Sequence, residues 1–592
     1  MMESNFPPFA LFVLGALAVP LLRGNSRNLV TIALPALGFF LVYTLTPGSF
    51  LEVRFFGFDL TLLRVDKLSK IFGYIFTLNG FAAFLYAYYL KDSRQHVSAL
   101  FYMAGALGVV FAGDLVTLYF FWEIMAVAST FLILARETPA AYKAGLRYIM
   151  VHLFGGLVLL AGIVLHISQT GSIEFSSALL ASRSLASYMI LGGILINAAA
   201  PPLHAWLSDA YPEATVTGGV IRSAYTTKTA VYTLIRGFPG YEVLIVVGCI
   251  MTIYGIIYAL LENDMRRILA YSIINQVGFM VTGVGIGTAM SLNGAAAHAF
   301  CHIIYKALLW MSAGSVLYMT GKSKCTELGG LYKTMPWTMI LGTVGALAIS
   351  SVPFTSGFTS KPMIIEAAIH EHLAWVWLVL EVASAGVFLH AGIKFPYFVF
   401  FAKDRGLRPG EPPHRSMHMA MGLLAFLCIF LGVYPDPLYA ILPYEMDFHS
   451  VYTLPHVMRQ FQLLMFSALV FFLFLKLLKR TDTIALDTDW FYRKGGGLAY
   501  RFLDTTLNGL NRSVDRLFVG GLVPALARTT KNGAYHVACA AMLPIWVLGG
   551  KTESIKDRKV TLRDSIDTRT MPVGLSAAAA AVLLILFFLL GR

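Results

Sequence analysis

Residues 295–318, AAAHAFCHIIYKALLWMSAGSVLY, are apolar over a length that spans a bilayer, yet they carry His298, His302 and Lys306 at intervals of four. Four residues advance a helix by about 400°, so the three groups fall within a sector of roughly 80°. An uncompensated charge at mid-bilayer costs at least about 2.5–3.5 kcal/mol, so such groups face protein or water and mark paths for ions. We interpret this stripe as the candidate conductor. The alternative is a set of core groups that hydrogen-bond neighbouring helices.

The composition is that of a polytopic membrane protein. Of the 592 residues, 57% are hydrophobic and 13% charged, and the mean hydropathy is +0.70. The net charge of +13 lies in loops between apolar spans, which favours lipid headgroups and membrane topology over nucleic acid as its explanation. The five cysteines form no CxxC pattern or Cys/His cluster, so we expect no metal, no cofactor and no disulfide framework.

Apolar segments predict an all-α fold with about 14 core transmembrane helices and about two further spans near the carboxyl terminus. The amino-terminal segment lacks a basic n-region, so we expect the first span to be retained. The predicted core spans are 8–22, 29–46, 67–90, 97–112, 114–134, 145–167, 185–208, 215–236, 241–261, 267–287, 292–319, 337–367, 373–401 and 417–436, followed by 457–478 and 571–590.

Lysine and arginine are concentrated in alternate loops, which predicts an external amino terminus and cytoplasmic basic loops. The basic loops are those with Arg23 and Arg27, Lys91 and Arg94, Arg136 and Lys143, Arg266 and Arg267, Lys322, Lys324 and Lys333, and Lys403, Arg405, Arg408 and Arg415.

Two spans contain helix-breaking sequences. The seventh has Pro201-Pro202, and the twelfth has SVPFTSGFTS around Pro353 and Gly357. Proline removes a backbone donor and clashes with the preceding turn, so each span should form two half-helices with an unwound middle. The breaks lie five spans apart, as two inverted five-helix repeats would produce.

These features predict six regions. They are 1–96 (helices one to three), 97–236 (first half-channel), 237–401 (second half-channel), 402–480 (helices fourteen and fifteen), 481–570 (a basic cytoplasmic or membrane-surface segment) and 571–592 (a carboxyl-terminal span). Residues 498–548 are expected to form amphipathic surface helices or a small soluble lobe. Gly520-Gly521 and Pro524 argue against one continuous helix there.

Further ionisable residues lie inside other predicted spans. Glu123 is near the centre of the fifth, where burial favours its neutral form and a nearby lysine would favour the charged form. Its structural alternative is a fixed salt bridge. Lys228, Lys361 and Lys394 lie in the eighth, twelfth and thirteenth spans, and burial favours the neutral amine, which could carry a proton. Lys394 could instead extend to the cytoplasmic interface.

Successive motifs resemble the antiporter-like membrane proteins over about residues 60–435. They are DLVTLYFFWEIMAVAS (114–129), AYKAGLRYIMVHLFGG (141–156), PPLHAWLSDAYPEA (201–214), TKTAVYTLIR (227–236), DMRRILAYSIINQVGF (264–279), HAFCHIIYKALLW (298–310) and SGFTSKP (356–362). This family includes the A and D subunits of Mrp-type sodium/proton antiporters and the proton-pumping subunits of respiratory complex I and membrane-bound hydrogenases. NAAAPPLHAW and AMGLLAFLCIFLGVYP are most similar to the D-type proteins of Mrp antiporters, whereas the tail resembles longer subunits with a lateral helix.

The resemblance implies roles for individual residues. It makes Glu123 the carboxylate of the first half-channel, Lys228 the eighth-helix lysine and Lys361 the twelfth-helix lysine. His298, His302 and Lys306 then link the two halves, with Lys394 in a supporting position where several relatives have arginine. The family's seventh-helix lysine is here Asn197. We expect Lys228 to replace it as the partner of Glu123; Arg222 is the alternative, and could only hold Glu123 ionised.

Three functions therefore compete. The first is a proton-translocating, or sodium/proton-antiporting, subunit of a multisubunit complex in a bacterial inner membrane. The second is a proton-pumping subunit of a complex I-like oxidoreductase or a hydrogenase, with the redox centres in other chains. The third is a structural subunit with an inactive channel, which Asn197 alone supports. No Walker motif, dinucleotide fingerprint or nucleophile triad is present, so the sequence predicts no redox or hydrolytic chemistry of the chain's own.

Overall fold

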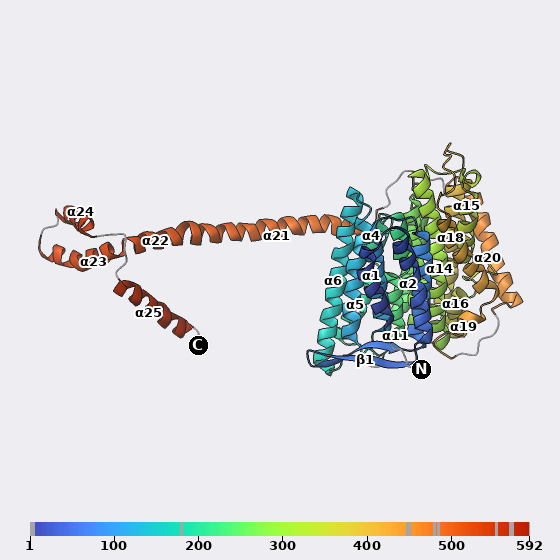
Figure 1. Ribbon diagram of the computed structural model, residues 1–592, viewed down its shortest axis with the longest axis horizontal. Helices are drawn as coiled ribbons and strands as arrows, with labels where there is room; N and C mark the ends of the chain where they lie inside the picture. Colours follow the sequence, from blue (N-terminus) through green and yellow to red (C-terminus); the bar gives the residue numbers. More distant parts are fainter. Residues whose placement is uncertain are drawn as a thin grey trace. The chain divides into compact units, whose positions relative to one another are not determined.

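The computed structural model describes residues 6–177, 182–445, 451–477, 481, 486–550, 554–566 and 573–590. The chain divides into two compact units, Met1–Asp489 and Trp490–Arg592, and Figure 1 shows the first as a bundle of helices. Ten helices in the described residues are long and apolar enough to cross a membrane, and Pro8–Leu21, Leu185–Asn197 and Pro336–Ile349 are shorter apolar helices of the same unit. The chain is a multi-pass α-helical membrane protein.

The first unit contains α1 (Pro8–Ala18), η1 (Val19–Leu21), α2 (Gly24–Thr44), β1 (Gly48–Phe55), β2 (Phe58–Val65), α3 (Lys67–Tyr86), α4 (Ser93–Phe111), α5 (Leu115–Leu134), α6 (Pro139–Thr170), α8 (Leu185–Asn197), α9 (Ala205–Ala210), α10 (Val216–Arg222), α11 (Thr226–Gly237), α12 (Val243–Leu261), α13 (Met265–Ile286), α14 (Ala289–Thr320), η2 (Leu331–Lys333), α15 (Pro336–Ile349), α16 (Lys361–His370), α17 (Ala374–Val387), η3 (Phe388–Lys394), η4 (Tyr397–Phe401), α18 (Arg415–Val433), α19 (Asp436–Tyr439) and α20 (Leu454–Leu473).

Helices α13 and α14 form the centre of the bundle. The most apolar 18-residue window of α13 is 100% buried and that of α14 is 94% buried, against 22% for α20 at the periphery. α14 contacts α3, α10, α11, α13, α15, α16 and α18. A helix enclosed on all sides needs every polar group on it to face protein or internal water.

A two-stranded antiparallel hairpin, β1–β2, departs from the all-α prediction. Gly48 pairs with Val65 and Phe55 with Phe58, and the two-residue turn holds Phe56 and Gly57 at φ 47° and 86°. Positive φ at both turn positions matches the twist of paired strands. The sheet lies at one end of the bundle (Figure 1). Short strands joined by a tight turn give no apolar run of membrane length, so a search for spans does not detect them.

The helical path is interrupted where the proline-containing sequences predict. α8 ends at Asn197 and α9 begins at Ala205, and α15 ends at Ile349 while α16 begins at Lys361. A further interruption, which no proline predicted, separates α10 from α11 at Ser223–Tyr225. Here the Ser223 and Thr229 hydroxyls donate to backbone carbonyls, in a segment rich in side chains that compete with helical hydrogen bonds. The thirteenth span continues from α17 into wider π-helical turns at η3 and η4.

The second unit contains α21 (Asp489–Leu517), η5 (Phe518–Leu522), α22 (Val523–Lys531), α23 (Gly533–Leu548), α24 (Ile555–Ser565) and α25 (Val573–Leu590). The first residue of α21, Asp489, is the last residue of the first unit. As expected, residues 498–548 do not form one continuous helix, because α22 ends at Lys531 and α23 begins at Gly533. The break does not lie at Gly520-Gly521 and Pro524, where the residues at both ends of η5 keep right-handed helical dihedral angles. A π-turn at the two glycines widens the helix and accommodates the missing donor of Pro524. No residue of α21 is buried. α25 contains the apolar stretch Ala579–Phe588, within the span predicted at 571–590.

Candidate functional site

The stripe on α14 is fully buried. His298, His302 and Lys306 have no exposed surface, and the two imidazole centroids are 6.2 Å apart. His298 hydrogen-bonds Gln276 Oε1 of α13 at 3.1 Å and Ser360 Oγ at 3.2 Å, and Ser360 belongs to the interruption between α15 and α16. Within the described residues, neither ring nitrogen of His302 nor the Lys306 amine has a hydrogen-bond partner. Buried polar atoms of this kind require internal water or a changing partner.

The other buried lysines bond to carbonyls at the ends of helices. Lys228 Nζ donates to the Ser223 carbonyl at 2.7 Å, and Lys361 Nζ donates to the Ile349 carbonyl at 3.1 Å. Both carbonyls lie beside a helix interruption. Lys394 donates to Ala259, Leu260 and Glu262 at 2.6–2.9 Å. The last carbonyls of a helix lack intrahelical donors and carry partial negative charge, so each amine gains both a partner and a favourable field.

Lys394 reaches the end of α12 that precedes the basic segment with Arg266 and Arg267. Its side chain has no exposed surface and caps the carboxyl end of α12. His390, one turn earlier, bonds the Gly386 carbonyl through Nδ1 at 2.7 Å.

Glu381 of α17 was not among the predicted site residues. It is the acidic side chain that interacts electrostatically with Lys361, and it lies 4.0 Å from Arg459 Nε of α20. An isolated carboxylate in an apolar span is the signal that identified Glu123, and the same signal marks Glu381 within residues 374–387.

Glu123 lies half-buried on α5 between two different surroundings. On one side it contacts α6 so closely that a Cβ on Gly156 would overlap its carboxylate. On the other it lines an apolar groove of ≈ 800 Å³ with Val97, Phe101 and Val127. Glu123 makes no ion pair with any described residue, and Oε1 has no described hydrogen-bond partner. The structure therefore does not bring Lys228 or Arg222 to Glu123.

Polar side chains from four elements gather on the α6 side of Glu123. His152 is buried, with its ring 4.1 Å from Tyr148 and 4.5 Å from Trp206 between centroids, and Asn197 is its polar neighbour. The Arg222 guanidinium is fully buried between the rings of Tyr148 and Tyr211, 4.4 Å from each centroid. These contacts hold a permanent cation in the first half of the bundle by cation–π attraction. Sequence spacing alone did not identify His152.

A buried carboxylate, Asp487, lies near the interrupted segment that follows α8. It accepts hydrogen bonds from His204 at 3.1 Å and from Tyr254 and Tyr271 at 2.5 Å each. Burial by itself would raise the pKa of Asp487, but the hydrogen bonds outweigh it and hold the pKa below the ordinary value. Asp487 stays ionised and ties the chain after α20 to α12 and α13. In the sequence it belongs to a stretch that resembles a loop. Its partners are more than 200 positions away, so the local sequence does not reveal its role.

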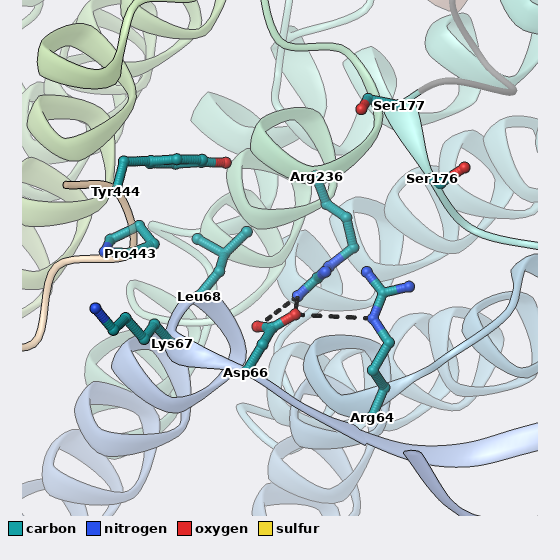
Figure 2. Close-up of a pocket in the computed structure, with 9 residues that line it drawn as sticks. All are labelled: Arg64, Asp66, Lys67, Leu68, Ser176, Ser177, Arg236, Pro443 and Tyr444. Carbon is teal, nitrogen blue, oxygen red and sulfur yellow. Dashed lines mark hydrogen bonds and ion pairs between the residues drawn. The ribbon is translucent and has the colours of Figure 1, made fainter. Parts of the chain in front are cut away.

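A separate hollow of ≈ 420 Å³ lies where β2, α3 and α11 meet (Figure 2). Arg236 Nη2 donates to Asp66 Oδ1 at 2.8 Å, and Arg64 Nε lies 3.8 Å from Asp66 Oδ2. Asp66 also accepts from Ser69 N as the N-cap of α3. Two guanidiniums thus share one carboxylate and tie the end of α11 to the start of α3. None of the predicted site residues lines this hollow.

The family described as "NADH:quinone oxidoreductase/Mrp antiporter, TM" matches residues 112–387. That range contains Glu123, Lys228, the α14 stripe and Lys361. The match covers just under half of the chain, and over these residues the chain is similar to this family of antiporter-like membrane proteins.

Relatives of this antiporter-like protein occur in both ion-gradient and respiratory complexes. The A/B subunit of a probable K(+)/H(+) antiporter of Rhizobium meliloti is 30% identical over 64% of this chain and 40% of its own. The D subunit of the Na(+)/H(+) antiporter of Alkalihalophilus pseudofirmus is 28% identical over 60% and 78%. A chain of an archaeal membrane-bound sulfane sulfur reductase superposes with a TM-score of 0.65, at 26% identity, over 73% and 95%. The antiporter-like chain thus spans less than half of the first relative and about three quarters of the second.

Proposed function

We propose that this protein conducts protons across the membrane, as one subunit of a larger complex. The observation that carries the proposal is a series of ionisable side chains inside one bundle: the half-buried Glu123 on α5 and the buried Lys228 on α11, His302 on α14 and Lys361 on α16. His298 and Lys306 support the series on α14, and Lys394 and Asn197 adjoin it. Placing an ionisable side chain at this depth costs free energy, and such side chains in membrane proteins mark paths for ions or protons.

Proton movement along this series requires internal water. Four residues of a helix span about 6 Å along its axis, which is too far for direct transfer between side chains. The unpartnered atoms of Glu123, His302 and Lys306 are places where such water would hydrogen-bond. Because neighbouring groups titrate together, a proton arriving at one site changes the affinity of the next.

Two inverted repeats, at 97–236 and 237–401 within about 14 core helices, supply the two half-channels in this proposal. The support is a set of helix caps and isolated β-bridges in the first repeat that recur 150 positions later in the second. Asp114 and Asp264 are the N-caps of α5 and α13, and Thr138 and Thr288 are the N-caps of α6 and α14. Gly171 and Gly321 end α6 and α14 in left-handed conformation. Isolated β-bridges join Asp114 to Glu174 and Asp264 to Lys324. Internal repeats of this kind are typical of membrane transporters.

The apolar groove beside Glu123 supports assembly with other membrane proteins. Ile124, Val127 and Phe131 of α5 are 39–54% exposed there, and Glu123 lines the same groove. A membrane-embedded acid is normally covered by protein or water rather than by lipid tails. We propose that a transmembrane helix of a neighbouring subunit fills the groove, with the complex in a bacterial inner membrane and the amino terminus outside.

Two parent complexes fit this protein. A secondary antiporter, with or without sodium as the counter-ion, agrees with the relative from the Na(+)/H(+) antiporter, of which the chain covers 78%. A redox-driven pump is favoured by the likeness to a chain of an archaeal respiratory membrane complex. The redox centres would then belong to other subunits.

Substitutions in the α14 stripe test the proposed function. His302→Ala and Lys306→Ala are expected to abolish proton flux in vesicles that contain the assembled complex. Cys301→Ala is the matched control, because Cys301 is buried on the same helix but does not belong to the stripe. A packing role predicts that assembly is lost first, because truncating a fully buried side chain leaves a cavity. Normal flux in both stripe variants would refute the relay.

A further inference from the structure

His152 of α6 occupies the position that His302 occupies on α14. The two helices are each 32 residues long, begin after Thr138 and Thr288, and end before Gly171 and Gly321. In this alignment His152 and His302 are the same position, and Gly156 corresponds to Lys306. Both histidines are buried. His302 has no hydrogen-bond partner among the described residues, and His152 has the Asn197 side chain as its polar neighbour. The first repeat therefore contains a counterpart of the central histidine in the second.

His152 lies one helical turn from the glycine that contacts Glu123, and beside Asn197. Gly156, which contacts the Glu123 carboxylate, is one turn along α6 on the same face as His152. Asn197 adjoins the His152 ring, and it is the position where the family resemblance expects lysine. Asparagine can orient water or donate a hydrogen bond, but it cannot accept and release a proton at neutral pH. Imidazole can do so.

We propose that His152 is the proton carrier of the first half-channel, in place of the lysine that Asn197 lacks; this rests on the proposed function above. The O–H bond of protonated Glu123 breaks and, through a bridging water, an N–H bond forms on one ring nitrogen of His152. Glu123 is left as a carboxylate beside an imidazolium. The other ring nitrogen then releases its proton to a water on the side of the bundle centre, which leaves neutral His152 in its other tautomer. Glu123 takes up the next proton, and the ring regains its first tautomer before that proton is passed on.

Arg222 keeps the carrier from holding its proton. Its guanidinium remains charged and acts electrostatically on His152, while it is held in place between Tyr148 and Tyr211. A fixed cation nearby disfavours the imidazolium, so the proton does not remain on His152. Arg222 is thus a positioning residue, because it acts on the proton through His152.

The test compares two histidines of the same helix. His152→Gln keeps an amide of similar size but removes the titratable ring, whereas His166→Gln makes the same change at a histidine that is 1% exposed and lies 14 positions further along α6. Both variants are made in the full chain, and proton flux is measured in vesicles after assembly has been checked. Loss of a general acid–base group typically costs about 10²–10⁴-fold in rate, so we expect His152→Gln to lose at least about 100-fold and His166→Gln to keep near-normal flux.

A rescue experiment completes the design. Adding Asn197→Lys to His152→Gln should restore part of the flux, because it supplies a titratable amine beside the vacated position. If His152→Gln does not assemble, the smaller His152→Asn takes its place in the same comparison. Equal losses in the His152 and His166 variants would overturn the proposal. So would normal flux in His152→Gln while Glu123→Gln is inactive, an outcome that leaves the proposed function standing. Normal flux in Glu123→Gln would instead refute the proposed function.

Discussion

Gly156→Ala is predicted to inactivate transport without destabilising the protein. The added Cβ would overlap Oε1 of Glu123 and lie 2.9 Å from its carboxyl carbon, whereas ordinary contacts at such positions are 3.4–4 Å. The carboxylate must therefore move by on the order of 1 Å to reach a normal separation. It is the far end of a flexible side chain, with the groove on its other side, so the backbone of α5 and α6 need not move.

The expected effects on stability and on transport have opposite signs. Replacing glycine by alanine inside a helix contributes about 1 kcal/mol of stability through helix propensity. Displacing a reacting group by about 1 Å can cost about 100-fold in rate, which corresponds to about 2.7 kcal/mol of barrier. Gly156→Ala should therefore unfold at the same temperature as the parent protein or higher, while its proton flux falls by about two orders of magnitude.

The assay measures proton flux in vesicles containing the assembled complex, with thermal unfolding followed in detergent. Gly192→Ala on α8 is the matched control, because the nearest atom to its new Cβ is 4.0 Å away. Glu123→Asp in the Gly156→Ala background shortens the acid by one methylene group and should recover part of the flux. Parent-level flux in Gly156→Ala would show that the carboxylate position against α6 does not matter for transport.

Two further predictions concern topology and capping. A cysteine at position 408 should be labelled only from the cytoplasmic side of intact cells, and labelling from outside would reverse the proposed orientation. Lys394→Met should lower the unfolding temperature, because three carbonyls at the end of α12 lose a charged donor, and hydrogen bonds to a charged group are worth about 1.5–3 kcal/mol each. Lys67→Met, at an exposed lysine, is the control; equal unfolding temperatures for the two variants would contradict the capping role.

Residues related by spacing within one helix were predictable. His298, His302 and Lys306 share one face of α14 because the helix repeat is a local property of the backbone. The interruptions before Ala205 and Lys361 were predictable because proline alters the helix at its own position. Glu381 carried the same signal as Glu123 and could have been identified. The interruption between α10 and α11 had no proline to mark it.

Partners of these residues on other elements were not predictable. Lys228 was expected beside Glu123 because it lies on the next span, yet its amine bonds the Ser223 carbonyl of its own interrupted segment. Asp487 had no recognisable motif, and its role depends on His204, Tyr254 and Tyr271 from three other elements.

The sequence by itself determined the membrane class of this protein, the stripe on α14 and the interrupted helices, since hydropathy, helix repeat and proline act through neighbouring positions. Only the tertiary structure decided which elements face one another: Gly156 against Glu123, Asn197 beside His152, and Arg222 between two tyrosines. Such contacts depend on how closely two helices approach and at which turn, and the packing of the whole bundle sets both. The proposed route from Glu123 to the centre therefore depends on the packing of the bundle.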